Sequence, residues 1–105
     1  MKKIYVIWIG WIGVSGIARY YNQQGYQVFG SDKTHSELID TLINEGIDII
    51  IGEDAEKIDE SFEKVIYTEA VPKTQSELQK SIQLGLPIFT YPEALWEIAN
   101  EKKLI

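Results

Sequence analysis

Three regularly spaced glycines are the residues of this chain best suited to bind a ligand. Gly10, Gly13 and Gly16 lie in the stretch IGWIGVSGIA at residues 9–18, directly after a short apolar run that is typical of a β-strand. Glycine permits a positive φ and a close approach of the backbone to a ligand, and the N–H groups at the start of a following helix point toward an anion. Between a strand and a helix, these glycines predict a turn that binds a diphosphate.

Two tryptophans make this turn an incomplete match to the dinucleotide-binding pattern G-x-G-x-x-G. Trp8 stands where the pattern has its first glycine, and Trp11 stands beside the second, Gly10. A partial match is also typical of a plain connection between a strand and a helix. On these residues alone, both interpretations stay open.

An acidic residue follows the turn at the distance expected of a ribose contact. Asp32 comes after the second expected strand, about twenty positions beyond the turn, where dinucleotide-binding domains carry such an acid. The sequence Gly30-Ser31-Asp32 is equally typical of a loop in which the aspartate bonds to nearby backbone. Asp32 is therefore either a ligand contact or a turn residue.

The elements that must position these residues alternate along the chain. Short β-branched runs predict strands at residues 3–8, 27–30, 48–51, 64–68 and 87–90, and amphipathic stretches predict helices at residues 13–24, 36–45, 74–84 and 92–101. Several strands are apolar on both faces, which is typical of parallel strands covered by helices. We therefore expect an α/β fold, a Rossmann-like open parallel five-stranded sheet of order 3-2-1-4-5 with helices on both faces. Such sheets bind ligands at the carboxyl ends of their strands.

Local signals set several boundaries of these elements. Gly25, Gly46 and Gly85 lie where helices are expected to stop, and Thr74-Gln75-Ser76-Glu77 is a capping-box pattern that predicts a helix start. The acidic residues 52–63 predict a solvated connection with one helical turn.

Composition excludes several classes of function. The 105 residues suit one domain with a packed core, and a net charge of −6 has the wrong sign for binding nucleic-acid phosphates. The chain has no cysteine and a single histidine, His35, which excludes thiolate chemistry and a histidine metal cluster. The apolar run at residues 4–9 is too short for a signal-peptide core or a membrane span, so we expect a cytoplasmic protein.

Four segments together resemble the Mur ligase family. They are IGWIGVSGIA at residues 9–18, GYQVFGSD at 25–32, IGEDAE at 51–56 and YTEAVP at 67–72. The resemblance covers nearly the whole chain, and it places the family's ATP-binding loop just beyond Ile105.

The resemblance implies that residues 1–105 are a single N-terminal UDP-binding domain of a larger ligase, without its central ATP-binding and C-terminal domains. The implied substrate is UDP-N-acetylmuramate, to which the whole enzyme adds L-alanine with ATP and magnesium during cytoplasmic synthesis of peptidoglycan precursors. We expect this fragment to be inactive alone, with no catalytic residue, metal ligand or cofactor of its own. Its expected partners are the UDP-sugar and the ligase's other domains, and neither nucleic acid nor a membrane.

The same resemblance implies the site residues. The backbone of the glycine turn and helix start would contact the diphosphate, a serine would add a hydroxyl donor, the aspartate would line the uridine end, and the loop after the fourth strand would form the opposite wall. In chain order, these residues are Gly10, Trp11, Ile12, Gly13, Ser15, Gly16, Asp32, Thr68, Glu69 and Ala70. Thr68 stands where the family has a serine, whereas Glu69 departs from the small residue that is commonest there.

All three tryptophans fall at positions where the family has small residues. The resemblance places glycine at Trp8 and Trp11, and glycine or alanine at Trp96. A single cause, such as glycine codons translated as tryptophan or deliberate substitution, is one hypothesis, and ordinary aromatic packing is the other. We expect the indoles of Trp8 and Trp11 to impair binding of the UDP-sugar, and a left-handed backbone at either position to add strain of about 1–3 kcal/mol.

Other functions stay open on the sequence. A Rossmann-like sheet with Asp32 also fits an NAD(P)-binding domain of an oxidoreductase or sensor, because a fold alone does not define a function. Within the family, the ligase that recycles murein peptides is a neighbouring alternative. A third alternative is an interaction module whose pocket the tryptophans close.

Overall fold

The computed structural model describes residues 2–103. Within this range the strands are β1 (Lys3–Ile7), β2 (Gln27–Asp32), β3 (Asp48–Ile51), β4 (Phe62–Tyr67) and β5 (Ile88–Thr90). The helices are α1 (Ile12–Gln23), α2 (Glu37–Asn44), the short 3₁₀ helix η1 (Ala55–Lys57), α3 (Ser76–Gln83) and α4 (Tyr91–Lys103). Every strand and helix expected from the sequence is present, and the ends differ from expectation by at most two residues.

The five strands of the described chain form one parallel sheet in the order β3-β2-β1-β4-β5, which confirms the predicted fold. The central strand β1 pairs with β2 and β4, and its last residue Ile7 lies opposite Ser31 and Tyr67. Because the strands are parallel, their carboxyl ends meet at one edge of the sheet. The glycine turn, Asp32 and the loop that begins at Thr68 therefore lie at the same edge.

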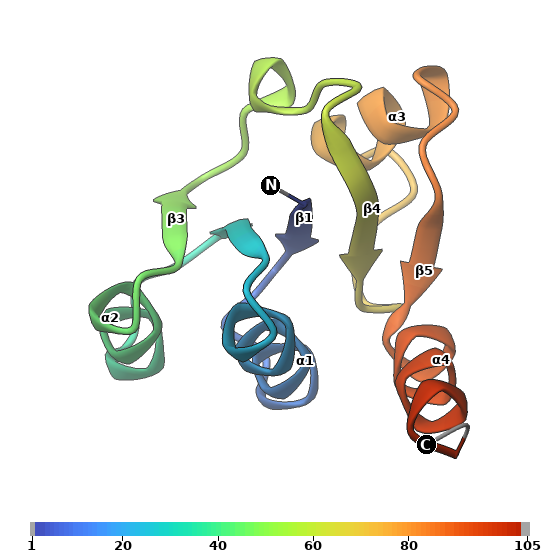
Figure 1. Ribbon diagram of the computed structural model, residues 1–105. Coiled ribbons are helices and arrows are strands. Elements are labelled where there is room, and N and C mark those ends of the chain that lie inside the picture. The colour runs from blue at the N-terminus through green and yellow to red at the C-terminus, as the bar shows by residue number, and fades with distance from the viewer. Residues whose placement is uncertain (1, 104–105) are drawn as a thin grey trace.

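Helices cover both faces of the sheet, as expected (Figure 1). One face carries α1, α2 and α4 and the larger core, while α3 and the segment around η1 lie on the other. Alternate residues of β1 face the two cores, Ile4 and Val6 the first and Tyr5 and Ile7 the second. These four side chains are at most 2% exposed, which is the burial that a central parallel strand requires.

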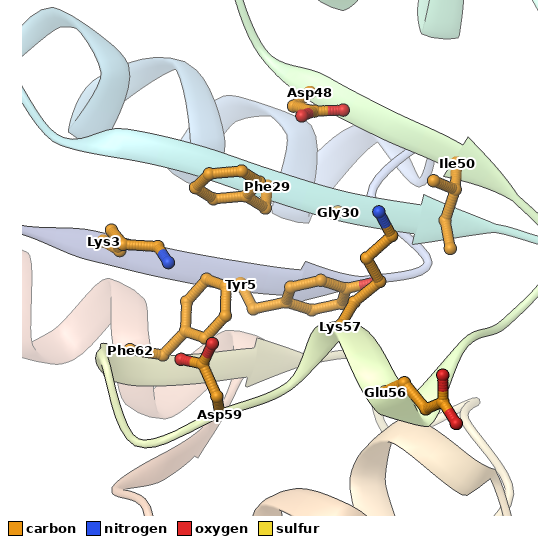
Figure 2. Close-up of a pocket in the computed structure, with 10 residues that line it drawn as sticks. All are labelled: Lys3, Tyr5, Phe29, Gly30, Asp48, Ile50, Glu56, Lys57, Asp59 and Phe62. Atoms are coloured by element: carbon orange, nitrogen blue, oxygen red, sulfur yellow. The ribbon is translucent and has the colours of Figure 1, made fainter.

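The second face is covered less completely, because one crossover lacks a long helix. Between β3 and β4 the chain forms only η1, and Ile58 anchors this connection in the second core. The sheet is consequently hollowed over β2 and β3 by a pocket of about 250 Å³, with Tyr5 and Phe29 among its lining residues (Figure 2). The predicted connection with one helical turn is confirmed.

The start of α3 differs from the expected capping box. The pattern predicts Thr74 as the capping residue, but the N-cap is Gln75, whose side chain accepts a hydrogen bond from the backbone N–H of Leu78 at 2.8 Å. Glu77 points into the interior and is fully buried. The capping prediction is therefore wrong, because hydroxyl donors on neighbouring strands occupy both oxygens of the Glu77 carboxylate.

Gly30 lets the turn that follows β1 pass closely over β2. A Cβ atom on Gly30 would lie 2.8 Å from the backbone oxygen of Val6 and 2.8 Å from Cδ1 of Ile9. Gly30→Ala should therefore lower the free energy of unfolding by about 1–3 kcal/mol, as other overpacked cores do. Urea denaturation measures this change.

Gly16→Ala is the matched control, because a Cβ atom on Gly16 in α1 meets nothing within 4 Å. Removing glycine from a helix interior should raise the free energy of unfolding by about 0.5–1 kcal/mol. A Gly30→Ala variant as stable as Gly16→Ala would contradict the close packing at Gly30.

Candidate functional site

An open pocket lies at the carboxyl edge of the sheet, where the loops after β1, β2 and β3 meet the loop before α3. It has a volume of about 320 Å³ and is lined by Trp8, Lys33, Gly52, Glu53, Pro72, Thr74 and Gln75. Open α/β sheets bind their ligands at this edge. We call this hollow the edge pocket, and it is the candidate site.

Opposite charges face this pocket. The ammonium group of Lys33 lies 4.8 Å from the ring centre of Trp8. Glu53 accepts hydrogen bonds from the backbone N–H of Ser76 at 2.7 Å and from its hydroxyl at 2.6 Å. These two bonds lower the pKa of Glu53 below its ordinary value, and the bond from the Ser76 hydroxyl has the larger effect. The carboxylate is therefore charged at neutral pH.

The start of α1, at the same edge, is open to an anion. Trp11 is the N-cap residue in an extended conformation, and its side chain makes no capping hydrogen bond. The first turn of α1 has no acidic residue, whereas α2 begins with a Ser36 cap and has Glu37 and Asp40 in its first turn. The first N–H groups of a helix lack intrahelical partners and carry the positive end of its dipole. The helix after the glycine turn therefore offers donors at the same edge of the sheet as the edge pocket, although none of its residues lines that pocket.

Asp32 holds the glycine turn. Its Oδ2 accepts a hydrogen bond from the backbone N–H of Gly10 at 2.8 Å, and its Oδ1 accepts one from Thr34 at 3.3 Å. A Cβ atom on Gly10 would lie 2.7 Å from Oδ2, so this bond requires glycine. Both oxygens of Asp32 thus bind backbone, as in the turn interpretation, and the residue fixes the path of the chain into α1.

The remaining predicted residues of α1 serve packing as well as the turn. Ser15 is buried, and its hydroxyl donates to the backbone oxygen of Ile12 at 2.7 Å. A Cβ atom on Gly13 would lie 2.9 Å from the ring of Tyr91 at the start of α4, whereas Gly16 faces open space. Trp11 and Ile12 are exposed at the mouth of the turn.

The loop after β4 lies beside the glycine turn, because β4 pairs with β1. Thr68 is buried, and its hydroxyl accepts a hydrogen bond from the backbone N–H of Ala70 at 3.1 Å. Glu69 and Ala70 are exposed. The structure thus brings all the predicted site residues to one edge, except that Ser15 and Gly16 lie further along α1.

Trp8 has a backbone conformation that favours glycine. Its φ of 60° is the one positive φ of a non-glycine residue among residues 2–103. The indole is 8% exposed, packs in the second core and stacks on Trp11 at 6.0 Å between ring centres. Trp11 has a φ of −75°, and Trp96 lies within α4 with 70% exposure, so neither has a glycine-like backbone. Packing of Trp8 is confirmed, and its backbone has the left-handed conformation for which we expect strain.

Two substitutions separate strain from packing at position 8. Both Trp8→Ala and Trp8→Gly remove the buried indole, which should lower the free energy of unfolding by about 3–5 kcal/mol. Only glycine relaxes the left-handed backbone, so Trp8→Gly should be more stable than Trp8→Ala by about 1 kcal/mol. Urea denaturation followed by circular dichroism measures the difference.

Trp96 supplies the control for this comparison. In the interior of α4 the order should reverse, with Trp96→Ala more stable than Trp96→Gly by about 1 kcal/mol. The same order of alanine and glycine at both positions would contradict the strain assigned to Trp8.

Sequence reasoning missed a buried carboxylate beneath the candidate site. Glu77 accepts hydrogen bonds from the hydroxyls of Tyr5 and Ser31, both at 2.5 Å, from the side-chain amide of Gln75 at 2.9 Å and from the backbone N–H of Asp54 at 3.1 Å. Burial and the bond to Glu77 raise the pKa of Tyr5 above its ordinary value, so its phenol stays a neutral donor. The capping-box pattern predicts a different role for Glu77, because in that pattern the glutamate accepts a hydrogen bond at the start of its own helix.

The hollow on the second face of the sheet is a separate feature. Tyr5, Phe29 and Phe62 lie along it in edge-to-face contact, and the ammonium group of Lys3 lies 4.5 Å from the ring centre of Phe62 (Figure 2). The aromatic surface here is thus already covered by a cation of the same chain. None of the predicted site residues lines this hollow, and none is among the lining residues of the edge pocket, which they flank at the carboxyl edge of the sheet.

Fold and site together define the class of the protein. An open parallel sheet of order 3-2-1-4-5, with a glycine turn leading into an uncapped helix, is a Rossmann-like α/β domain. The family model described as "Mur ligase family, catalytic domain" matches residues 3–103. The chain belongs to the Mur ligase family, as its sequence motifs predict.

Individual relatives agree with this assignment. The chain is 40% identical to the UDP-N-acetylmuramate–L-alanine ligase of Porphyromonas gingivalis over 93% of its length and 23% of the relative's. The crystal structure of UDP-N-acetylmuramate-alanine ligase from Thermotoga maritima matches with a TM-score of 0.91 and 26% identity, over 98% of this chain and 24% of that one.

A ligase named for UDP-N-acetylmuramate and a peptide, in place of L-alanine, shares the fold less closely. The UDP-N-acetylmuramate:L-alanyl-gamma-D-glutamyl-meso-diaminopimelate ligase of Neisseria meningitides matches with a TM-score of 0.79 and 29% identity, over 92% of this chain and 31% of that one. The chain thus spans about a quarter of the length of its relatives. Within residues 2–103, no helix is both long and apolar enough to cross a membrane.

Proposed function

We propose that this chain is the UDP-N-acetylmuramate-binding domain of an ATP-dependent ligase that adds L-alanine to this substrate in peptidoglycan precursor synthesis. The observation that carries the proposal is the 40% identity to a ligase named for these two substrates, over nearly the whole chain. The exposed donors at the start of α1 supply what a diphosphate needs at this edge.

The hydrogen bonds of the turn indicate which donors remain for the diphosphate. The N–H of Gly10 is bonded to Asp32, and the N–H of Trp11 donates to the backbone oxygen of Trp8 at 3.2 Å. In our proposal the diphosphate contacts therefore fall to Ile12 and Gly13, while Gly10 and Asp32 hold the turn in place.

The other predicted residues complete the site in this proposal, together with Lys33, which the sequence analysis did not predict. Lys33 adds positive charge at the pocket, and Asp32 marks the uridine end. The loop of Thr68, Glu69 and Ala70 forms the opposite wall. Ser15 supports the turn from within α1, where Gly16 faces open space.

We propose ligation itself for a longer cytoplasmic protein, because the chain spans only about a quarter of its relatives' length. Among residues 2–103, no group of three or more acidic or histidine side chains is arranged to hold a metal ion without a phosphate ligand. We assign ATP and magnesium to the other domains of that ligase, where ATP would supply the phosphoryl group that drives amide formation. This domain alone would bind substrate without catalysing the reaction.

Calorimetric titration of the chain with UDP-N-acetylmuramate, UDP and NAD tests the proposal. We expect the two uridine compounds to bind and NAD to give no heat, because only the uridine compounds present the ligand that the family resemblance implies. Binding of NAD alone would favour the oxidoreductase alternative. Absence of binding by all three, both to the unsubstituted chain and to the Trp8→Gly, Trp11→Gly variant that lacks the two indoles, would overturn the assignment as a nucleotide-binding domain.

Removing the stacked indoles should strengthen this binding. Trp11 is the N-cap residue of α1 and precedes the backbone N–H groups of Ile12 and Gly13. Its indole stacks on Trp8 over the turn. We expect the Trp8→Gly, Trp11→Gly double variant to bind UDP at least about tenfold more tightly, a gain of about 1.4 kcal/mol. Calorimetry well below the unfolding midpoint of each form measures the affinities.

The single variant Trp11→Gly keeps this prediction testable if the double variant is unstable. Trp11 is half exposed, and glycine is well accepted at an N-cap, so this variant should fold normally. It should show part of the gain in affinity. Unchanged affinity in both variants would show that the indoles do not obstruct the site.

A further inference from the structure

We propose that Glu77 is a positioning residue of the edge pocket, which holds the loop after β3 and the start of α3 in place as the walls that receive the uridine nucleotide. This inference rests on the proposed function and extends it to a residue that touches no ligand. Its basis is the hydrogen-bonded contact of one buried carboxylate with four separate segments of the chain.

The four donors to Glu77 use both oxygens of its carboxylate. Oε1 accepts from Ser31 on β2 and Gln75 before α3, while Oε2 accepts from Tyr5 on β1 and the N–H of Asp54 after β3. All four donors are neutral, and Glu77 is 0% exposed. A buried carboxylate is tolerated only where such bonds are complete, and loss of one acceptor oxygen would leave two of the four donors without their partner.

Two of these bonds fix walls of the pocket directly. Gln75 lines the pocket, donates to Glu77 and accepts from Leu78 N–H, so both ends of its amide are held. Gly52 and Glu53 also line the pocket, and two hydrogen bonds hold their loop. The N–H of Gly52 donates to the backbone oxygen of Asp32 at 2.7 Å, and the N–H of Asp54 donates to Glu77.

The same carboxylate is linked to the glycine turn. Ser31, which donates to Glu77, immediately precedes Asp32, which accepts from Gly10 N–H. Two carboxylates with neutral donors thus define the relative positions of the loops after β1, β2 and β3. Glu77 lies beneath the pocket and acts on a ligand only through Gln75 and the loop that ends at Asp54.

Glu77→Gln tests this role, because it keeps the shape of the side chain and replaces one acceptor oxygen with a donor NH₂ group that faces donors. We expect the dissociation constant for UDP, measured by calorimetry well below the unfolding midpoint, to rise by about tenfold. Amide hydrogen exchange at Asp54 should accelerate by at least about tenfold, because the variant has one acceptor oxygen for four donors and a neutral amide oxygen accepts more weakly than a carboxylate.

Ser81→Ala is the matched control. Ser81 is also fully buried on α3, and its hydroxyl donates to the backbone oxygen of Glu77 at 2.8 Å without touching the carboxylate. This variant should lose stability yet keep its UDP affinity and its Asp54 exchange rate within about twofold of the unsubstituted chain. If Glu77 had a merely structural role, Glu77→Gln and Ser81→Ala would show the same UDP affinity and the same Asp54 exchange rate when compared at equal stability. That result would overturn the proposal.

Tyr5→Phe provides a second test if Glu77→Gln does not fold. It removes one donor, keeps the buried charge and preserves the ring contact with Phe62. We expect a rise in the UDP dissociation constant of about threefold and faster exchange at Asp54. Unchanged values of both would contradict the proposed coupling.

The exchange measurement separates the two proposals. If neither the unsubstituted chain nor the Trp8→Gly, Trp11→Gly variant binds UDP, the proposed function is wrong, and Asp54 exchange still reports whether Glu77 holds the loop. If UDP binds but Glu77→Gln leaves its affinity unchanged, the proposed function stands and the positioning role is wrong.

Discussion

The hydrogen bond from Gly10 N–H to the carboxylate of Asp32 is the interaction on which the candidate site depends. It joins the turn after β1 to the end of β2, and the backbone oxygen of Asp32 also accepts from Gly52 after β3. A hydrogen bond to a charged group contributes about 1.5–3 kcal/mol, enough to fix one path for a short turn. That path determines where α1 begins and where its first N–H groups point.

Trp8 shows how packing overrides local backbone preference in the same turn. A left-handed tryptophan costs about 1–3 kcal/mol, but burial of a large aromatic side chain is worth about 3–5 kcal/mol. Burial of the indole outweighs the backbone strain, so the turn keeps a glycine-like backbone at a residue with the largest side chain. The indole then forms part of the edge pocket, where it also contacts the ammonium group of Lys33.

Local electrostatics at the carboxyl edge differ from those of the chain as a whole. The net charge of −6 repels polyanions, yet an uncapped helix start and Lys33 place positive charge at this edge, beside the carboxylate of Glu53. Short-range donors can bind one diphosphate in an acidic protein, because they act over hydrogen-bond distances that salt and distant charges affect little. The carboxylate of Glu77 is fully buried beneath this surface, and its four hydrogen bonds order the surrounding loops.

The sequence by itself determined the sheet order, the glycine turn and the family, because strand and helix periodicities and the motifs around Gly10 and Asp32 are local patterns. Only the tertiary structure decided what Asp32 and Glu77 bind. Gly10 and Asp32 are 22 positions apart, and Tyr5 and Glu77 are 72 apart. The side chain of Glu77 had a reasonable local role as a helix cap, and it lost that role because parallel pairing brings hydroxyl donors of β1 and β2 beneath α3. Contacts between such distant residues depend on how the elements pack, and packing is a property of the whole folded chain.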